Sequence, residues 1–302
     1  MIQVSNFTKR YGDFLAVDDI SFEVRQGEIF GLLGPNGAGK TTTLECLEGI
    51  RMPDGGELLV AGIDPTRDPH GLRSAVGVQL QSSGMPDSIT PNEAMNLFCG
   101  YHKVEPSYDL LDRLGLSGKR KTQYHELSTG QQRRLALALA VAHRPRVIFL
   151  DEPTAGLDVQ TRVELHNLMR ELRAGGATII LATHDMAEAE EMADRVAILL
   201  SGRIVTIGTP MEITATGAGM TKVSVRTQNN GLLTNGSGFP AVVRHGVKDE
   251  YAIYYSEDIG RTVSAIIQSV DSHNDSLIDL RVERPSLEDR FLELTDTRAR
   301  NG

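Results

Sequence analysis

A lysine and a threonine at the end of a glycine-rich segment are the residues of this chain whose spacing points most clearly to chemistry. The segment follows the pattern G-x-x-x-x-G-K-T and consists of Gly34, Pro35, Asn36, Gly37, Ala38, Gly39, Lys40 and Thr41, and Thr42 follows it. Glycines let the backbone wrap tightly, so that its N–H groups can point at phosphate oxygens. Lys40 would reach the β- and γ-phosphates of a nucleotide, and the Thr41 hydroxyl would ligate Mg²⁺. The pattern predicts a nucleoside triphosphate site that includes all nine residues.

Two acidic residues follow a short apolar run at the point where a buried strand would end. The run is Val147–Leu150, and Asp151 and Glu152 come directly after it. An aspartate in this place can hold Mg²⁺, and the neighbouring glutamate can face the γ-phosphate and polarise the attacking water. Solvated charges often end a strand, so the pair is a weak signal when taken alone. Together with the phosphate loop upstream, it predicts a site that hydrolyses the nucleotide.

A third segment, Leu127–Gln131, reads Leu-Ser-Thr-Gly-Gln before a helix expected at Gln131–Ala142. In isolation, Ser128 or Thr129 would simply be the N-cap of that helix. In this order after the phosphate loop, the segment resembles the LSGGQ signature of ATP-binding cassette (ABC) ATPases. The resemblance covers about residues 1–210 and implies that the segment completes the ATP site of a second nucleotide-binding subunit across a dimer interface. The residues that would make this contact are Ser128, Gly130 and Gln131.

Three other segments match the family in turn. Ala155–Asp158 looks like the loop that links the two sites of the dimer, which gives Asp158 a place in the predicted site. His184 looks like the switch histidine that hydrogen-bonds the γ-phosphate and orients the water. Tyr11 resembles the aromatic residue that stacks on adenine, although plain packing in the core would also account for it.

The resemblance also implies a glutamine that contacts Mg²⁺ and senses the transmembrane partner. Two candidates, Gln79 and Gln81, would lie on the same face of an extended strand. Gln81 is favoured because it lies nearer the start of the helical segment that follows. Thr129 departs from the family, which usually has glycine there, and its side chain could crowd the opposing phosphate and slow hydrolysis.

The elements expected to position these residues alternate between apolar strands and helices. We expect strands at Glu28–Leu33, Val147–Leu150, Thr178–Ala182 and Val196–Leu200, and helices at Lys40–Glu48, Gln160–Arg173 and Met186–Ala193. Such alternation is typical of a mostly parallel sheet with helices on both faces, here an α/β P-loop NTPase core. Residues from about 86 to 143 lack the alternation and are predicted to form a helical subdomain inserted in that core.

The residue pattern of the sequence changes after Pro210, where glycine and asparagine residues separate short apolar runs. The predicted domains are therefore 1–210, which binds the nucleotide, and 211–302, a small α+β domain with an accessory or regulatory role. The ending Pro285–Leu294 resembles the C-terminal tail of drug-export ABC ATPases from bacteria. The resemblance implies an ATPase subunit that powers a multidrug- or lipid-type exporter through a separate transmembrane permease. An ABC importer ATPase and a soluble ABC-type ATPase stay open as alternatives.

The composition limits the partners and the location of the protein. Among 302 residues, 24% are charged and the net charge is −9, which argues against nucleic acid as the main partner without excluding a local basic patch. Cys46 and Cys99 have no metal-ligand spacing and are expected to be reduced. The most apolar helical run, Leu135–Ala142, is too short to cross a bilayer. We expect a cytoplasmic protein that sits peripherally on the cytoplasmic face of the cell membrane, binds ATP and Mg²⁺, and forms a homodimer.

Overall fold

A computed structural model of the chain describes residues 1–80, 84–215, 221–235, 238–283 and 286–301. The chain folds into two compact units, Met1–Thr209 and Pro210–Gly302. The expected nucleotide-binding residues all belong to the first unit.

A six-stranded sheet with strand order β5-β6-β7-β3-β8-β9 forms the centre of the first unit. Neighbouring strands pair in parallel except at one edge, where β8 and β9 are antiparallel. The strands are β3 (Ile29–Leu33), β5 (Val76–Gln79), β6 (Val147–Asp151), β7 (Thr178–Thr183), β8 (Arg195–Leu200) and β9 (Arg203–Gly208). All residues of β3, β6 and β7 are buried, as parallel strands covered on both faces require. The predicted α/β core with a mostly parallel sheet is confirmed.

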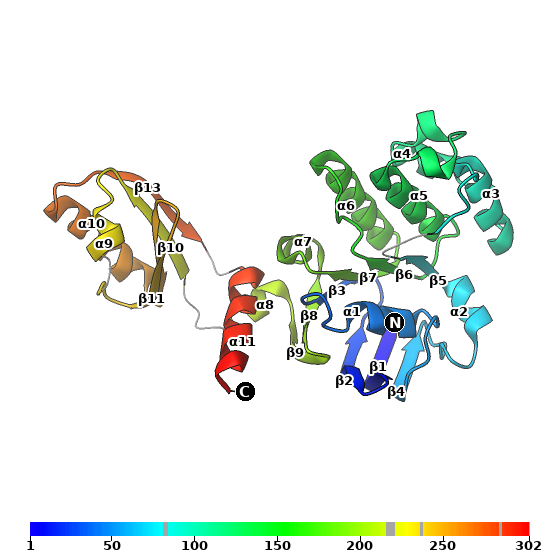
Figure 1. The fold of residues 1–302 in the computed structure, drawn as a ribbon, viewed down its shortest axis with the longest axis horizontal. Coiled ribbons are helices and arrows are strands. Elements are labelled where there is room, and N and C mark those ends of the chain that lie inside the picture. The colour runs from blue at the N-terminus through cyan, green and yellow to red at the C-terminus, as the bar shows by residue number, and fades with distance from the viewer. Residues whose placement is uncertain (81–83, 216–220, 236–237, 284–285, 302) are drawn as a thin grey trace. The chain divides into compact units, whose positions relative to one another are not determined.

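Helices cover both faces of this sheet. In Figure 1, α6 and α7 lie on one face and α1 lies on the other. The helices of the core are α1 (Lys40–Leu47), α2 (Pro69–Ala75), α6 (Val159–Ala174) and α7 (Met186–Met192). Asp158 caps α6 and Asp185 caps α7, each accepting hydrogen bonds from backbone N–H groups of the first turn.

A second, three-stranded antiparallel sheet completes the first unit and was not expected from the sequence. It consists of β1 (Ile2–Tyr11), β2 (Phe14–Val24) and β4 (Gly55–Val60), in the order β2-β1-β4. Its inner face packs with α1 and the central sheet into one apolar core, which includes Phe7, Phe22, Leu44, Phe30 and Phe149. The sheet therefore holds α1 against the strands that carry the acidic residues.

The connection from β5 to β6 forms the helical insertion, shown in cyan to green in Figure 1. It contains α3 (Pro91–His102), α4 (Tyr108–Arg113) and α5 (Thr129–Val141), together with short 3₁₀ turns at Ser117–Lys119 and Tyr124–Glu126. Its described residues form no strand, so the predicted helical subdomain is confirmed. No helix in the described part of the chain is both long and apolar enough to cross a membrane.

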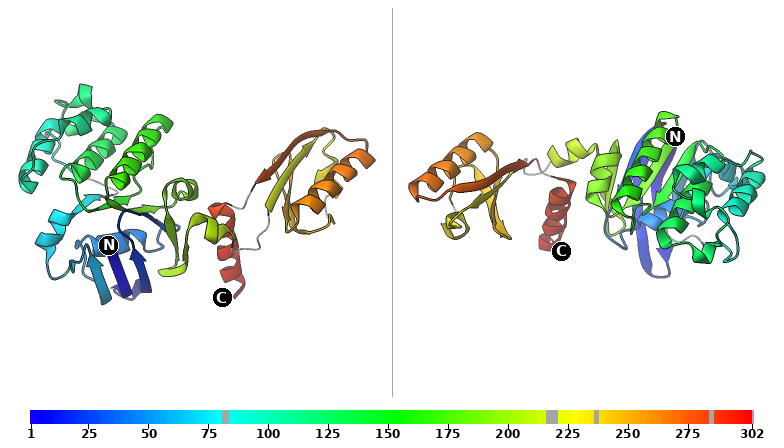
Figure 2. Two further views of the ribbon diagram at one scale, coloured as in Figure 1. Left: turned by 180° about the vertical axis from the view of Figure 1, so that it is seen from behind. Right: turned by 90° about the horizontal axis from the view of Figure 1, so that it is seen from above.

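The second unit has an antiparallel four-stranded sheet of order β11-β12-β10-β13. Its elements are α8 (Pro210–Ala215), β10 (Thr221–Thr227), α9 (Gly231–Asn235), β11 (Val242–Lys248), β12 (Tyr251–Ser256), α10 (Ile259–Ser272), β13 (Leu277–Glu283) and α11 (Leu287–Asn301). Figure 2 shows α10 along one face of this sheet, where Ile266 and Val270 pack on Val223 and Tyr254. The predicted α+β character of this region is confirmed.

Candidate functional site

The glycine-rich loop curls around the ammonium group of its own lysine. Lys40 is only 6% exposed, and its Nζ donates hydrogen bonds to the carbonyl oxygens of Gly34 at 2.7 Å and Pro35 at 3.3 Å. The turn into α1 passes through Gly39 at φ 103°, where a Cβ atom would lie 2.7 Å from the carbonyl oxygen of Ala16. Only glycine fits this turn, because the backbone is left-handed and the neighbouring strand leaves no room.

Thr41, the first residue after the lysine, reaches the acidic end of β6. Its Oγ1 donates a hydrogen bond of 2.8 Å to Oδ2 of Asp151. The other carboxylate oxygen of Asp151, Oδ1, is buried and has no hydrogen-bond partner among the described residues. Burial raises the pKa of Asp151, while the hydrogen bond from Thr41 and the charge of Lys40 oppose the rise. A buried, half-satisfied carboxylate beside a hydroxyl is a donor set suited to a hard cation.

Glu152 lies between the lysine and the histidine that follows β7. One carboxylate oxygen, Oε1, is 3.8 Å from Nζ of Lys40, and the other, Oε2, is 2.7 Å from Nδ1 of His184. Glu152 is buried while His184 is 55% exposed at its side chain. Burial lowers the pKa of Lys40, and the negative charges of Glu152 and Asp151 counteract this. The predicted Lys40, Thr41, Asp151, Glu152 and His184 thus form one continuous cluster.

This cluster opens into a cavity of about 330 Å³ above the loop. The lining consists of Tyr11, Phe14, Ala16, Asn36, Gly37, Ala38, Gly39, Lys40, Thr41, Thr42 and Glu152. Tyr11 and Phe14 face each other across the turn of the hairpin between β1 and β2. Phe14 and Ala16 were missed from the sequence. The signal that could have found them is the aromatic residue on each side of the two-residue turn Gly12-Asp13.

The signature-type residues lie elsewhere on the first unit. Ser128 is the N-cap of α5, and it exchanges hydrogen bonds with Gln131 in a capping box. This box starts the helix at Thr129, so the expected start at Gln131 was wrong by two residues. The described lining of the nucleotide cavity includes none of Ser128, Gly130, Gln131 or Asp158.

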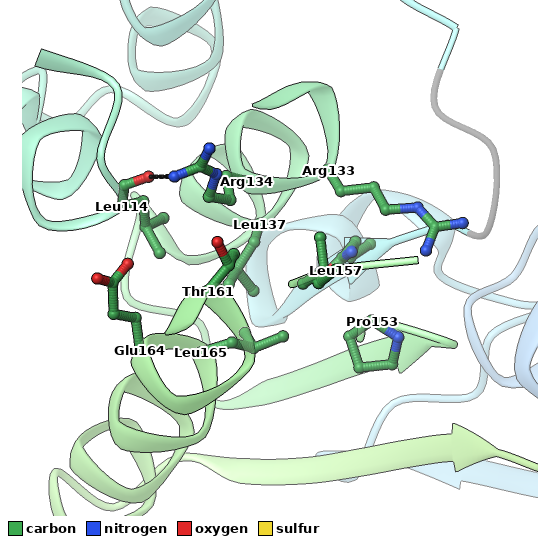
Figure 3. Close-up of a pocket in the computed structure, with 10 residues that line it drawn as sticks. Leu114, Arg133, Arg134, Leu137, Pro153, Leu157, Thr161, Glu164 and Leu165 are labelled. Atoms are coloured by element: carbon green, nitrogen blue, oxygen red, sulfur yellow. Dashed lines mark hydrogen bonds between the residues drawn. The ribbon is translucent and has the colours of Figure 1, made fainter. Parts of the chain in front are cut away.

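The loop that ends in Asp158 packs on the beginning of α5. A Cβ atom on Gly130 would lie 3.6 Å from Cδ2 of Leu157. Figure 3 shows Leu157 beside a small cavity of about 10 Å³ between α5 and α6, where Arg134 donates a hydrogen bond to the carbonyl oxygen of Leu114. This packing brings the signature-type segment and the loop before α6 together on one side of the unit.

Of the two glutamines proposed to contact Mg²⁺, the described residues include Gln79 but not Gln81. Gln81, the favoured one, lies outside the described residues. Strand β5 ends at Gln79, so the described strand does not extend to a second glutamine on its face. Gln79 is 3% exposed and lines the small cavity between α5 and α6, and its Oε1 has no hydrogen-bond partner among the described residues.

A parallel sheet with a phosphate loop between β3 and α1, and acidic residues at the end of a neighbouring strand, defines a P-loop nucleoside triphosphatase. All these residues sit at the carboxyl ends of the strands, where open α/β sheets bind their ligands. The helical insertion and the signature-type segment narrow this class to an ATP-binding cassette.

Comparisons with known proteins give the family. A family profile described as "ABC transporter" matches residues 17–155. Nod factor export ATP-binding protein I from Ralstonia nicotianae is 35% identical over 309 residues, covering 100% of this chain and 95% of that protein. Daunorubicin resistance ATP-binding protein DrrA3 from Streptomyces coeruleorubidus is 31% identical, covering 97% of this chain and 95% of that protein.

Solved structures agree with this result. The ATP-binding subunit of an ABC transporter superposes with a TM-score of 0.69 at 26% identity, covering 72% of this chain and 94% of that structure. A dimeric cassette bound to ADP and phosphate in a post-hydrolysis state superposes with a TM-score of 0.64 at 25% identity, covering 69% of this chain and 98% of that structure. The chain belongs to the ATP-binding proteins of ABC transporters, and it is an ATPase.

Proposed function

We propose that this protein is the ATP-hydrolysing subunit of an ABC exporter that works as a homodimer on a transmembrane permease. The observation that carries the proposal is the continuous cluster of Lys40, Thr41, Asp151, Glu152 and His184. Three of these residues, Lys40, Thr41 and Glu152, line the cavity. The names of the full-length relatives, which refer to export and drug resistance, support the exporter class over the importer class.

The cluster has the groups that phosphoryl transfer to water requires. Lys40 would neutralise charge on the β- and γ-phosphates, and the loop N–H groups would hold their oxygens. Glu152 would orient a water and accept its proton as the water oxygen bonds to the γ-phosphorus. The bond from that phosphorus to the bridging oxygen breaks, and ADP leaves with the electron pair. His184 would hold the carboxylate of Glu152 in place and contact the γ-phosphate.

The residues also fit a magnesium ion. Thr41 Oγ1, which lines the cavity, and Oδ1 of Asp151, which has no hydrogen-bond partner among the described residues, are hard oxygen donors beside each other. A Mg²⁺ ion held by these oxygens would supply positive charge to the phosphates of the nucleotide. Gln81 is proposed as a further contact to the ion, in line with the family resemblance.

A second copy would complete each site. Ser128, Gly130, Gln131 and Asp158 are absent from the described lining of the chain's own cavity. The exposed N-terminus of α5 can face an anion, because its backbone N–H groups and dipole are positive there. An isologous two-fold dimer would bring this helix end to the γ-phosphate of the opposite subunit, with both copies contributing equally.

An apolar groove between the helical insertion and the core is the proposed docking surface for the permease. Its volume is about 550 Å³, and its walls come from α3 and α5 on one side and from α2, β5 and the end of α1 on the other. Leu97 and Tyr101 in this groove are 61% and 62% exposed. Large apolar side chains gathered in an exposed groove indicate a partner surface. Docking here would hold the protein on the cytoplasmic face of the membrane.

The second unit, residues 211–302 in the predicted division, is proposed as an accessory or regulatory domain. It has its own sheet and its own apolar core, and the relatives named above extend over it. Deletion after Thr209 that left dimer formation and transport unchanged would argue against such a role.

The experiment combines dimerisation with capture of the membrane partner. Tagged Glu152→Gln is loaded with ATP and Mg²⁺, purified from native membranes in mild detergent, and examined by light scattering and mass spectrometry. We expect a dimer that retains a polytopic membrane protein. The groove variant Leu97→Asp, as the matched control, should still dimerise and lose the membrane protein. A strictly monomeric Glu152→Gln, or retention of ribosomes in place of a membrane protein, contradicts the proposal.

A further inference from the structure

One acidic side chain in the docking groove has a buried oxygen without a hydrogen-bond partner among the described residues of the first unit. Glu48 is the C-cap residue of α1, and its backbone N–H donates to the carbonyl oxygens of Leu44 and Cys46. Its side chain is buried at 7% exposure and lines the groove, and its Oε2 has no hydrogen-bond partner among the described residues. No ion pair to its carboxylate occurs in that part of the chain either. Buried carboxylates are normally paired, so an orphaned one needs an explanation.

The surroundings of Glu48 disfavour its ionised form as long as no cation lies beside it. The groove wall around it is largely apolar, with Val78, Leu97 and Phe98 among its residues. Burial, with the nearby charges of Asp151 and Glu45, raises the pKa of Glu48 to about 8. The ionised carboxylate is therefore disfavoured in the groove by itself, and an incoming cation would stabilise it by replacing the proton.

Two histidines and one arginine also face this groove, beside the phenol of Tyr101. His102 and His143 stack with ring centroids 3.7 Å apart, and burial together with His102 lowers the pKa of His143 to about 4. Burial also lowers the pKa of His102 below its usual value, so both rings are mainly neutral at pH 7. Arg73 lines the groove from α2 but is exposed. A side chain that enters deeply thus meets the acid of Glu48, while Arg73 stays at the solvent edge.

We propose that Glu48 recognises a cationic side chain, arginine or lysine, on the apolar face of an amphipathic helix that docks in this groove. The inference rests on the docking proposed above and adds the chemistry by which the partner is selected. A groove lined by α3 and α5 on one side, with exposed large apolar side chains, favours a helix as occupant that inserts apolar anchors. Charge complementarity with an otherwise unpaired carboxylate supplies the specificity.

The position of Glu48 also links docking to the nucleotide. Helix α1 begins with Lys40 and Thr41 at the glycine-rich loop, and its C-cap residue Glu48 lies in the groove. The charge of Asp151 already acts on Glu48 across the first unit. A cation bound at Glu48 would therefore change the electrostatic field at the acid that receives the hydrogen bond from Thr41.

The test uses the full chain and four synthetic amphipathic helical peptides that are identical except for one central position on the apolar face. That position carries arginine, lysine, glutamine or glutamate, and binding is measured by fluorescence anisotropy at pH 7. We expect the arginine and lysine peptides to bind at least tenfold more tightly than the glutamine peptide, as is usual for a desolvated charge pair. Glu48→Gln should remove this preference, and Glu57→Gln, an exposed acid outside the groove, should keep it.

Two further measurements separate the possible failures. Leu97→Asp should weaken all four peptides, and calorimetry in two buffers should show that the arginine peptide releases a proton from the wild type but not from Glu48→Gln. Equal affinity for arginine and glutamine, or a preference that survives Glu48→Gln in a folded protein, overturns the role of Glu48 and leaves docking intact. Failure of every peptide to bind overturns docking in this groove as well. ATP turnover, measured in parallel without any peptide, tests the ATPase activity separately from docking.

Discussion

Glu152 and His184 touch each other directly, with Nδ1 of the imidazole 2.7 Å from Oε2 of the carboxylate. They follow β6 and β7, which pair in parallel so that Asp151 lies opposite Ala182. Glu152 has a left-handed backbone at φ 51°, and its N–H donates to the carbonyl oxygen of Ala182. A non-glycine residue in this conformation costs on the order of 1 kcal/mol or more. The neighbouring strand therefore holds Glu152 in a strained position from which its side chain meets His184.

The contact predicts that the two side chains act as a unit in hydrolysis. We expect Glu152→Gln to reduce phosphate release by about 100-fold or more, because the general base is lost. His184→Ala should also slow the reaction, but in the Glu152→Gln background it should add little, as for residues that act together. Steady-state phosphate release from all three variants, with Glu105→Gln as an exposed control, measures this. If the double variant instead lowers the rate of phosphate release by the product of the two single effects, the contact between the side chains has no part in catalysis.

Adenine stacking at the hairpin predicts different effects for its two aromatic residues. The ring centroid of Tyr11 is 5.4 Å from the guanidinium carbon of Arg51 and 5.6 Å from Nζ of Lys9. Stacking on a base is worth about 1–3 kcal/mol, so Tyr11→Ala should weaken ATP binding about tenfold while Tyr11→Phe retains it. Titration with a fluorescent ATP analogue gives the affinities. If Phe14→Ala has the larger effect, the stacking residue is Phe14.

Thr129 predicts a gain of activity on substitution. It is exposed at the first position of α5, the helix end expected to face the opposite phosphate. Thr129→Gly and Thr129→Ala should each raise the turnover of the dimer a few-fold, because the side chain no longer crowds the γ-phosphate. Thr129→Val, which keeps the volume and removes the hydroxyl, is the matched control and should not exceed the wild type. A gain in Thr129→Val would assign the effect to the hydroxyl and contradict the steric explanation.

The buried carboxyl group of Glu48 leads us to expect that the free energy of unfolding decreases as the pH rises. Its pKa is raised in the folded chain to about 8, so between the ordinary value of about 4.5 and that value the folded state binds a proton that the unfolded state has lost. Stability from this group is fully present below pH 4.5 and is lost as pH rises through 8. Thermal melting between pH 5 and pH 9 should show a larger decline for the wild type than for Glu48→Gln. Parallel curves for the two proteins would contradict the burial of Glu48.

The parallel core could be read from the sequence because its strands are buried on both faces. Val147–Leu150 is a continuous apolar run, and such runs between helix signals are typical of parallel strands. The phosphate loop and the acidic pair could be found for the same reason, since each follows such a run directly. His184 and Tyr11 became recognisable only through their order relative to these segments.

The antiparallel sheet and Glu48 could not be read in this way. The pairing of β1 with β2 contains three register shifts, so the alternation of inward and outward residues is interrupted and the strands give no regular pattern. Glu48 reads as an ordinary charged residue at a helix end. Its burial depends on β5 and on the insertion helices, which lie far away in the sequence, and local patterns hold no information about them.

The separation of Ser128 from the chain's own cavity has a kinetic consequence. If each catalytic centre needs a helix end from another copy, the rate at low protein concentration rises with the square of that concentration, and it becomes proportional to concentration only once pairs are saturated. Dilution would then switch the enzyme off without any inhibitor. A permease that binds two copies side by side would remove this dependence on protein concentration. Turnover would then be confined to copies that are already bound to the permease.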